Sequence, residues 1–122
     1  MRVLICDDDP VIRYLLKVVL TKRAGDEVIE VANADEVFDT ARRHRPDLIV
    51  LDYVMPNRSG ADVVEELRTD ETLGSIPIVF LTGRSDIAEE TLDEIGVAGL
   101  IEKPFDASAL PDRLHAFAAA KA

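Results

Sequence analysis

Short apolar runs alternate along the chain with longer segments in which apolar residues recur every three or four positions. The runs lie at residues 3–6, 28–32, 48–51, 76–81 and 99–101. Runs of this length are typical of β-strands, whereas the spacing in the segments between them is typical of amphipathic helices. The pattern therefore predicts strands and helices in regular alternation, with a helix at the C-terminal end.

Each expected helix has one apolar stripe. The stripes comprise Val11, Leu15, Val18 and Lys22, with Ile12, Leu16 and Val19 beside them; Val37, Phe38 and Ala41; Val63, Val64 and Leu67; Ile87, Thr91, Leu92 and Ile95; and Leu110, Leu114 and Phe117. Asp9 and Pro10 are typical of a helix start, and Gly25 is typical of a helix end. The last helix is expected to begin at about Ala109, because an earlier start would place Pro111 in its interior and remove a hydrogen bond.

The alternation of strands and helices predicts a parallel sheet with helices on both faces. The nearly continuous apolar runs at 3–6, 48–51 and 76–81 suit central strands, whereas Glu27 and Glu30 indicate that the second strand lies at an edge. We therefore expect an α/β fold built on a doubly wound five-stranded parallel sheet.

The composition restricts the function further. The chain has 122 residues, enough for a single domain (1–122), and its 48% hydrophobic and 31% charged residues are typical of a globular protein. A formal net charge of −10 disfavours direct binding to nucleic acid or to an anionic membrane. Cys6 is the only cysteine, which excludes an internal disulfide and fits a reducing cytoplasm. The apolar runs are too short to span a membrane, so we expect a cytoplasmic protein without a membrane partner.

Charged or hydroxyl side chains follow four of the five expected strands. They are Asp7 and Asp8 after the first strand, Asp52 after the third, Thr82 after the fourth and Lys103 after the fifth. In open parallel sheets, ligands bind outside the carboxyl ends of the strands, so these side chains are expected to converge at one edge. Each of them alone has a simpler explanation as a turn, strand-end or surface residue. Their occurrence at four separate strand ends favours a functional site.

Asp7 and Asp8 belong to a run of three acids whose nearest basic residues, Arg2 and Arg13, are several positions away. Asp9 is expected to cap the following helix, which leaves Asp7 and Asp8 to hold a cation. Oxygen ligands without nitrogen or sulfur suit a hard divalent ion, Mg²⁺ or Mn²⁺. The strand ends have no Ser-His-Asp or Cys-His arrangement, and no glycine-rich phosphate loop follows the first strand.

Over residues 2 to about 118, the sequence resembles the receiver domain of two-component response regulators, a chemotaxis-type, flavodoxin-like domain. The resemblance rests on Asp7-Asp8, on DYVMPNRSG from Asp52 to Gly60, on FLTG with Thr82 and on EKPF with Lys103. It implies the strand order 2-1-3-4-5. It also implies that Asp52 accepts a phosphoryl group from a histidine kinase or a histidine phosphotransfer protein.

The resemblance further implies a role for each residue of the site. The metal ligands would be Asp8 and Asp52 directly, Asp7 through a metal-bound water, and the backbone carbonyl of Val54. Thr82 and Lys103 would contact the phosphoryl oxygens, and the peptide bond before Pro104 would be cis. Three carboxylates, one Mg²⁺ and one lysine carry formal charges that sum to zero, so the cation would offset the repulsion between the acids.

The signal is expected to leave through the face formed by the fourth helix, the fifth strand and the fifth helix, chiefly by shifts of residues 83–90. It would pass to a downstream protein target or effector domain. Leu100 stands where many receivers have an aromatic residue, so no large aromatic swing is expected. The protein would be a signalling phosphoacceptor and not an enzyme, apart from autocatalytic phosphoryl transfer and autodephosphorylation. We expect either a stand-alone receiver or an excised domain.

Three alternatives remain open at this point. A phosphatase of the haloacid dehalogenase type would need a second aspartate two residues after Asp52, where the chain has Val54. A flavodoxin-like cofactor binder is disfavoured by the missing phosphate loop and the absence of tryptophan. A phosphorylation-independent, receiver-like interaction module is disfavoured because Asp52, Thr82 and Lys103 are all present.

Overall fold

The chain forms one five-stranded parallel sheet, in a computed structural model that describes residues 1–83 and 93–120. The strands are β1 (Arg2–Cys6), β2 (Glu27–Val31), β3 (Leu48–Asp52), β4 (Ile78–Thr82) and β5 (Gly99–Glu102). Their order in the sheet is β2-β1-β3-β4-β5, with every neighbouring pair parallel. The predicted fold class, the strand order and the edge position of the second strand are confirmed.

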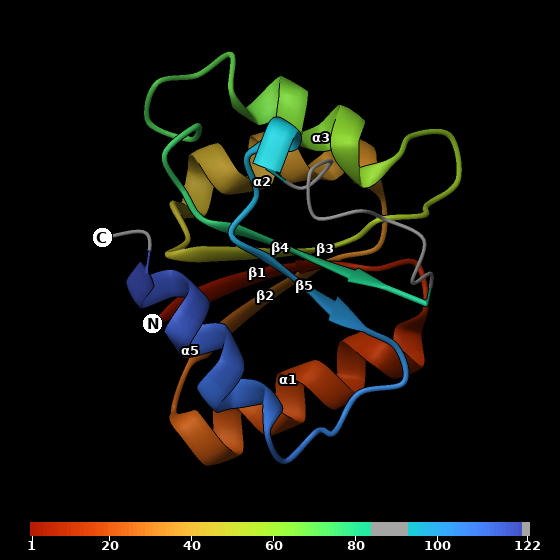
Figure 1. The fold of residues 1–122 in the computed structure, drawn as a ribbon, viewed down its shortest axis with the longest axis vertical. Coiled ribbons are helices and arrows are strands. Elements are labelled where there is room, and N and C mark those ends of the chain that lie inside the picture. The colour runs from red at the N-terminus through yellow and green to blue at the C-terminus, as the bar shows by residue number, and fades with distance from the viewer. Residues whose placement is uncertain (84–92, 121–122) are drawn as a thin grey trace.

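Helices cover both faces of this sheet (Figure 1). They are α1 (Pro10–Ala24), the short 3-10 helix η1 (Ala34–Glu36), α2 (Val37–His44), α3 (Gly60–Leu67) and α5 (Leu110–Ala120). Of the expected fourth helix, the structure describes only residues 93–95, which are helical. The rest of that helix, and most of the segment 83–90 expected to shift, lie outside the described residues. Within the described residues, no helix is long and apolar enough to cross a membrane.

Two separate cores lie on the two faces of the sheet. Side chains of a strand alternate between its faces, so β1 contributes Leu4 to one core and Ile5 to the other. The first core packs beneath α2 and α3, and the second beneath α1 and α5 (Figure 1). All residues of β3 and β4 are buried, which explains their nearly continuous apolar sequences.

The ends of α1 follow from local sequence signals. The carboxylate of Asp9 accepts a hydrogen bond of 2.9 Å from the backbone N–H of Val11, and Pro10 occupies the first helical position. Gly25 ends the helix in a left-handed conformation, with φ of 69°. Its backbone N–H donates to the carbonyl of Leu20. The predicted start and end of this helix are confirmed, and α1 therefore begins directly beside the acidic run.

The start of α5 agrees with the position of Pro111 in the sequence. Residues 107–109 form a turn, and the regular helix begins at Leu110. The carboxylate of Asp106 accepts a hydrogen bond of 2.9 Å from the N–H of Ser108, so it stabilises the turn and not the helix. Pro111 consequently falls in the first helical turn, where a missing N–H leaves no intrahelical bond unmade. The predicted late start of the helix is confirmed.

Candidate functional site

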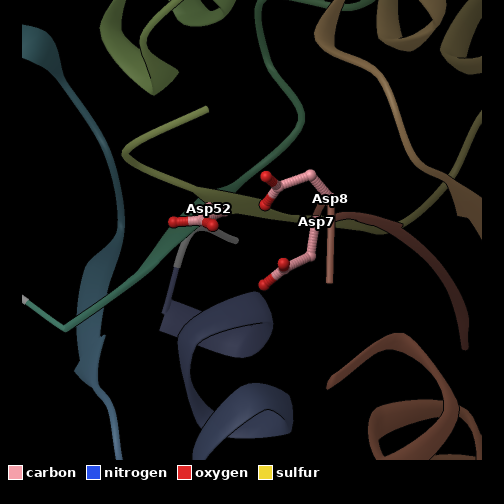
Figure 2. Close-up of side chains that lie close together, drawn as sticks. All are labelled: Asp7, Asp8 and Asp52. Carbon is pink, nitrogen blue, oxygen red and sulfur yellow. The ribbon is translucent and has the colours of Figure 1, made fainter. Parts of the chain in front are cut away.

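Three carboxylates meet at the carboxyl ends of β1 and β3. Asp7 and Asp8 follow the last residue of β1, and Asp52 is the last residue of β3. The parallel register pairs Cys6 with Leu51, so the next residues along both strands, Asp7 and Asp52, emerge together. One oxygen from each of the three acids lies within 4.8 Å of the others (Figure 2). The predicted convergence of these side chains is confirmed.

The three acids differ in their exposure to solvent. Asp7 is completely buried and Asp52 is 7% exposed, whereas Asp8 is exposed. Burial raises the pKa of the Asp52 carboxyl above its ordinary value, and the nearby charge of Asp7 raises it further. The ammonium of Lys103 and the N–H of Val54 act in the opposite direction. The surroundings of Asp52 therefore disfavour its negative charge. A cation bound beside it would offset this effect.

Lys103 bridges two of the acids. Its Nζ lies 2.9 Å from Oδ2 of Asp7 and 3.5 Å from Oδ2 of Asp52. Partial burial alone would lower the pKa of Lys103, but the hydrogen bond to Asp7 and the charges of both acids outweigh it, so the pKa is raised. The bond between Lys103 and Pro104 is cis, as the resemblance implied. The lysine therefore belongs to the same charged cluster as the carboxylates.

Thr82 lies at the same edge of the sheet. It is the last residue of β4 and is 1% exposed. β3 and β4 pair Asp52 with Leu81, which places Thr82 one position further along the neighbouring strand. The carbonyl of Thr82 accepts a hydrogen bond of 2.7 Å from the backbone N–H of Lys103. The structure thus joins the two residues predicted to contact a phosphoryl group at adjacent strand ends.

The loop at residues 53–59 follows Asp52 and carries Val54. The N–H of Val54 donates to Oδ1 of Asp52 over 3.2 Å, and the Val54 side chain is 51% exposed. An isolated β-bridge joins Val54 to Ser59, and the N–H of Gly60 donates to the carbonyl of Tyr53 over 2.8 Å. The loop is therefore closed at its base, with its first residues held against Asp52.

The donor atoms of the cluster suit a hard divalent cation. Asp7, Asp8 and Asp52 offer carboxylate oxygens, the ligand type preferred by Mg²⁺ and Mn²⁺. The nearest sulfur, in Cys6, is buried and lies 3.4 Å from the sulfur of Met55. Burial raises the pKa of the Cys6 thiol to about 12. The cluster of three carboxylates therefore fits a hard ion such as Mg²⁺.

One contact to the acidic run was missed from the sequence. Nη1 of Arg13 donates to the backbone carbonyl of Asp7 over 2.6 Å, although the two residues are separated in sequence. The N–H of Arg13 bonds to the carbonyl of Asp9, so the first turn of α1 carries the arginine back toward the end of β1. Counting residues from the N-cap Asp9 along a helical turn would have revealed this proximity.

Comparison with known proteins identifies relatives over nearly the whole chain. The model of the response regulator receiver domain matches residues 3–115. The phosphate regulon transcriptional regulatory protein PhoB of Pseudomonas aeruginosa is 37% identical over 116 residues, which are 93% of this chain and 50% of PhoB. The DNA-binding response regulator MtrA of Mycolicibacterium smegmatis is 34% identical, over 94% of this chain and 49% of MtrA. The chain thus spans about half the length of these relatives.

Solved structures with the same fold include single receiver domains. The chemotaxis response regulator CheY4 of Vibrio cholerae superposes with a TM-score of 0.87 at 29% identity, covering 95% of this chain and 97% of that one. The receiver domain of the sensor histidine kinase PA1611 from Pseudomonas aeruginosa PAO1 has a TM-score of 0.84 at 26% identity, covering 97% of both chains. That structure has a magnesium ion coordinated in its active site cleft.

These relatives correct one prediction made from the sequence. The net charge of −10 led us to expect no direct nucleic-acid partner. That expectation is wrong, because MtrA is a DNA-binding response regulator and PhoB is a transcriptional regulatory protein. The charge describes these 122 residues alone, whereas the relatives are about twice as long. The net charge of these residues therefore does not exclude nucleic acid as a partner of a protein that contains such a domain.

Proposed function

The chain belongs to the response regulator receiver domain family, a signalling family of two-component systems, and we propose that it accepts a phosphoryl group on the carboxylate of Asp52. The observation that supports this most directly is the cluster at the edge of the sheet. Asp52 lies within 4.8 Å of two further carboxylates, and Lys103 contacts it. An aspartate in these surroundings has a nucleophilic oxygen, a place for a cation and a fixed positive charge.

The chemistry proposed is a phosphoryl transfer between two proteins. A carboxylate oxygen of Asp52 attacks the phosphorus of a phosphohistidine, an O–P bond forms, and the P–N bond to the imidazole breaks. The released imidazole nitrogen takes up a proton. Lys103 neutralises charge on the phosphoryl oxygens, and the hydroxyl of Thr82 donates a hydrogen bond to one of them. Hydrolysis of the acyl phosphate by water returns Asp52 to its free form.

A divalent cation is proposed to assist this transfer. Asp7, Asp8, Asp52 and the carbonyl of Val54 would hold Mg²⁺ or Mn²⁺, whose charge offsets the repulsion between carboxylates and phosphoryl oxygens. The magnesium ion in the receiver domain of PA1611 supports this assignment. The ammonium of Lys103 remains 2.9 Å from Asp7, so the chain itself supplies one positive charge. Three of these four proposed ligands, the carboxylates of Asp7, Asp8 and Asp52, lie within 4.8 Å of one another.

A protein is the favoured phosphoryl donor, namely a histidine kinase or a histidine phosphotransfer protein. Large apolar side chains are exposed next to the acids: Val11 by 70%, Tyr14 by 69% and Val54 by 51%. Val11 and Tyr14 lie on the first turns of α1, directly after the acidic run, and Val54 follows Asp52. A protein that presents a phosphohistidine to Asp52 would bury these side chains, whereas a small phosphate donor would leave them in water.

The output of the phosphorylated domain is proposed to depend on the protein that contains it. In relatives about twice as long, a receiver domain belongs to a regulator that binds DNA or controls transcription. We propose that this domain likewise controls an effector region or a partner protein through its conformational state. Charge added at Asp52 would act on the adjoining strand end at Thr82 and on the chain that follows it.

Labelling with a small donor tests the proposal. The protein is incubated with acetyl phosphate, with and without Mg²⁺, and its intact mass is measured. We expect one phosphoryl group on the wild-type protein only when the divalent cation is present, and none on Asp52→Asn. Undiminished labelling of Asp52→Asn would contradict the assignment of Asp52. Absence of labelling on the wild type, with Mg²⁺ bound, would instead indicate a receiver-like interaction module.

A further inference from the structure

Arg58 links the loop at residues 53–59 to two other elements. Its Nη1 lies 3.0 Å from Oε1 of Glu66 and 3.5 Å from Oδ1 of Asp35, and its Nη2 donates to the carbonyl of Asp62 over 3.3 Å. Glu66 and Asp62 belong to α3, whereas Asp35 belongs to η1. The Arg58 side chain is 24% exposed. One guanidinium thus joins the loop to the helix that follows it and to η1, which is distant in sequence.

The loop has its own anchors at its base and at Met55, which is buried in the first core with its sulfur 3.4 Å from that of Cys6. The contacts of Gly60 with Tyr53 and of Val54 with Ser59 close the loop where it leaves the sheet. Beyond them, Asn57 has a positive φ of 73°, and the N–H of Arg58 donates to the carbonyl of Pro56 over 2.9 Å. These backbone bonds shape the loop tip but do not link it to η1. The side chain of Arg58 does so.

A cleft of about 100 Å³ lies between this loop and the turn before η1. Its walls are formed by residues 32–34 on one side and 55–57 on the other, and the acid Asp8 lines it as well. The ion pair of Arg58 with Asp35 joins the two residues that directly follow these wall segments. The contact therefore fixes the separation between the loop and η1, and with it the position of the loop relative to Asp8.

We propose that Arg58 is a positioning residue for the cation site, acting by holding the loop that carries the Val54 carbonyl against α3 and η1. This inference rests on the proposed function, because it concerns the cation bound by the same acids. Ion pairs at the surface contribute only about 0–1 kcal/mol to stability. The loss of Arg58 is therefore expected to affect cation affinity more than the free energy of unfolding.

The direction in which cation affinity changes when Arg58 is removed distinguishes a positioning role from a purely electrostatic one. Arg58 is positively charged, so removing it would strengthen cation binding if its charge acted only through space. If Arg58 positions the loop, its removal weakens cation binding instead. Arg43 provides the matched control, since it is an exposed arginine for which no ion pair is found within the described residues. Arg43→Ala removes the same charge without releasing the loop.

The experiment is a titration of the full chain with Mg²⁺ at fixed ionic strength, followed by amide chemical shifts. For Arg58→Ala we expect an affinity about tenfold weaker than that of the wild type, the lower end of effects seen for residues behind metal ligands. Arg58→Lys, which retains one contact, should lie between the two, and Arg43→Ala should bind as the wild type does. If Arg58→Ala fails to fold, Arg58→Lys carries the test alone, because it keeps the charge, so that weaker binding by this variant indicates lost positioning and unchanged binding would contradict the inference.

An Arg58→Ala variant that is folded and binds Mg²⁺ as tightly as the wild type, or more tightly, would overturn the inference. A wild-type protein that does not bind Mg²⁺ would overturn it too. A wild type that binds Mg²⁺ but is not labelled by acetyl phosphate would contradict the proposed function while leaving the role of Arg58 intact. Labelling and titration thus separate the two proposals.

Discussion

Asp7 and Asp8 are adjacent in the sequence but have different surroundings in the fold. Asp7 is buried, accepts a hydrogen bond of 2.8 Å from the N–H of Asp9 and contacts the ammonium of Lys103. Asp8 is exposed and lines the cleft beside the 53–59 loop. The alternation of side chains at the end of β1 explains this contrast, because successive residues point in opposite directions. Asp7 therefore contributes to the stability of the fold, whereas Asp8 is accessible to a ligand.

Neutralising each acid should separate these two roles. Asp8→Asn is expected to weaken Mg²⁺ binding strongly while changing the free energy of unfolding by no more than about 0.5 kcal/mol, as for other exposed sites. Asp7→Asn is expected to destabilise the protein by about 1–3 kcal/mol, because Lys103 loses a buried charged partner. Urea unfolding without metal measures the stabilities, and Mg²⁺ titration measures the affinities. Equal destabilisation by both substitutions would contradict the division of roles.

The residues of the site could be predicted because a topological rule applies to them. Polar residues at strand ends of a parallel sheet converge, whatever lies between them in sequence. The contacts made by these residues could not be predicted in the same way. Lys103 and Asp7 are 96 positions apart, and their pairing depends on the order of β1, β3, β4 and β5 in the sheet. The contacts of Arg58 could not be predicted from the sequence, since a single arginine in a loop usually remains in solvent.

At the scale of elements, local signals and tertiary contacts determine different features. The Asp9-Pro10 start of α1 and the late start of α5 were predicted because caps and prolines act within a few residues. The 3-10 helix η1 before α2 was not predicted, because its three residues are too few for a periodic pattern. The packing of α5 on β5 was not predicted either, as it depends on residues that are distant in sequence.

The packing of α5 on β5 is expected to be sensitive to substitution at Gly99 in β5. A Cβ atom added at Gly99 would overlap the aromatic ring of Phe117 in α5. Gly99→Ala should therefore destabilise the protein by about 1–3 kcal/mol, because the aromatic ring must move. In the double variant with Phe117→Leu, the two effects should be less than additive, since the smaller side chain leaves room for the methyl group. Chemical denaturation of the four proteins measures this coupling, and strict additivity would contradict the proposed contact.

At the scale of the whole molecule, negative charge is in excess. The chain has 24 acidic residues against 14 lysines and arginines, and three of the acids lie within 4.8 Å of one another. Self-repulsion of this kind destabilises the compact state, and it is strongest where the charges are buried. Lys103 offsets part of this repulsion, because its ammonium pairs with Asp7 and Asp52. It supplies one positive charge for the three carboxylates of the cluster. The stability of the whole domain is therefore expected to depend on pH and on divalent cations through this site.

Asp52 provides the test of that dependence. Its pKa in the folded protein is raised above the ordinary value of 3.8, so between these two values the folded state binds more protons than the unfolded state, and stability falls as the pH rises. Asp52→Asn removes this unfavourable charge and should raise the unfolding temperature at pH 7 without metal, an advantage that disappears as the pH falls below 3.8. Mg²⁺ at about 100 times its dissociation constant should stabilise the wild type by about 2.7 kcal/mol, and the variant by less. Thermal unfolding at several pH values, with EDTA or Mg²⁺, measures both effects. A variant that is less stable than the wild type at pH 7 in EDTA would show that the Asp52 charge stabilises the fold, contrary to the burial and repulsion described here.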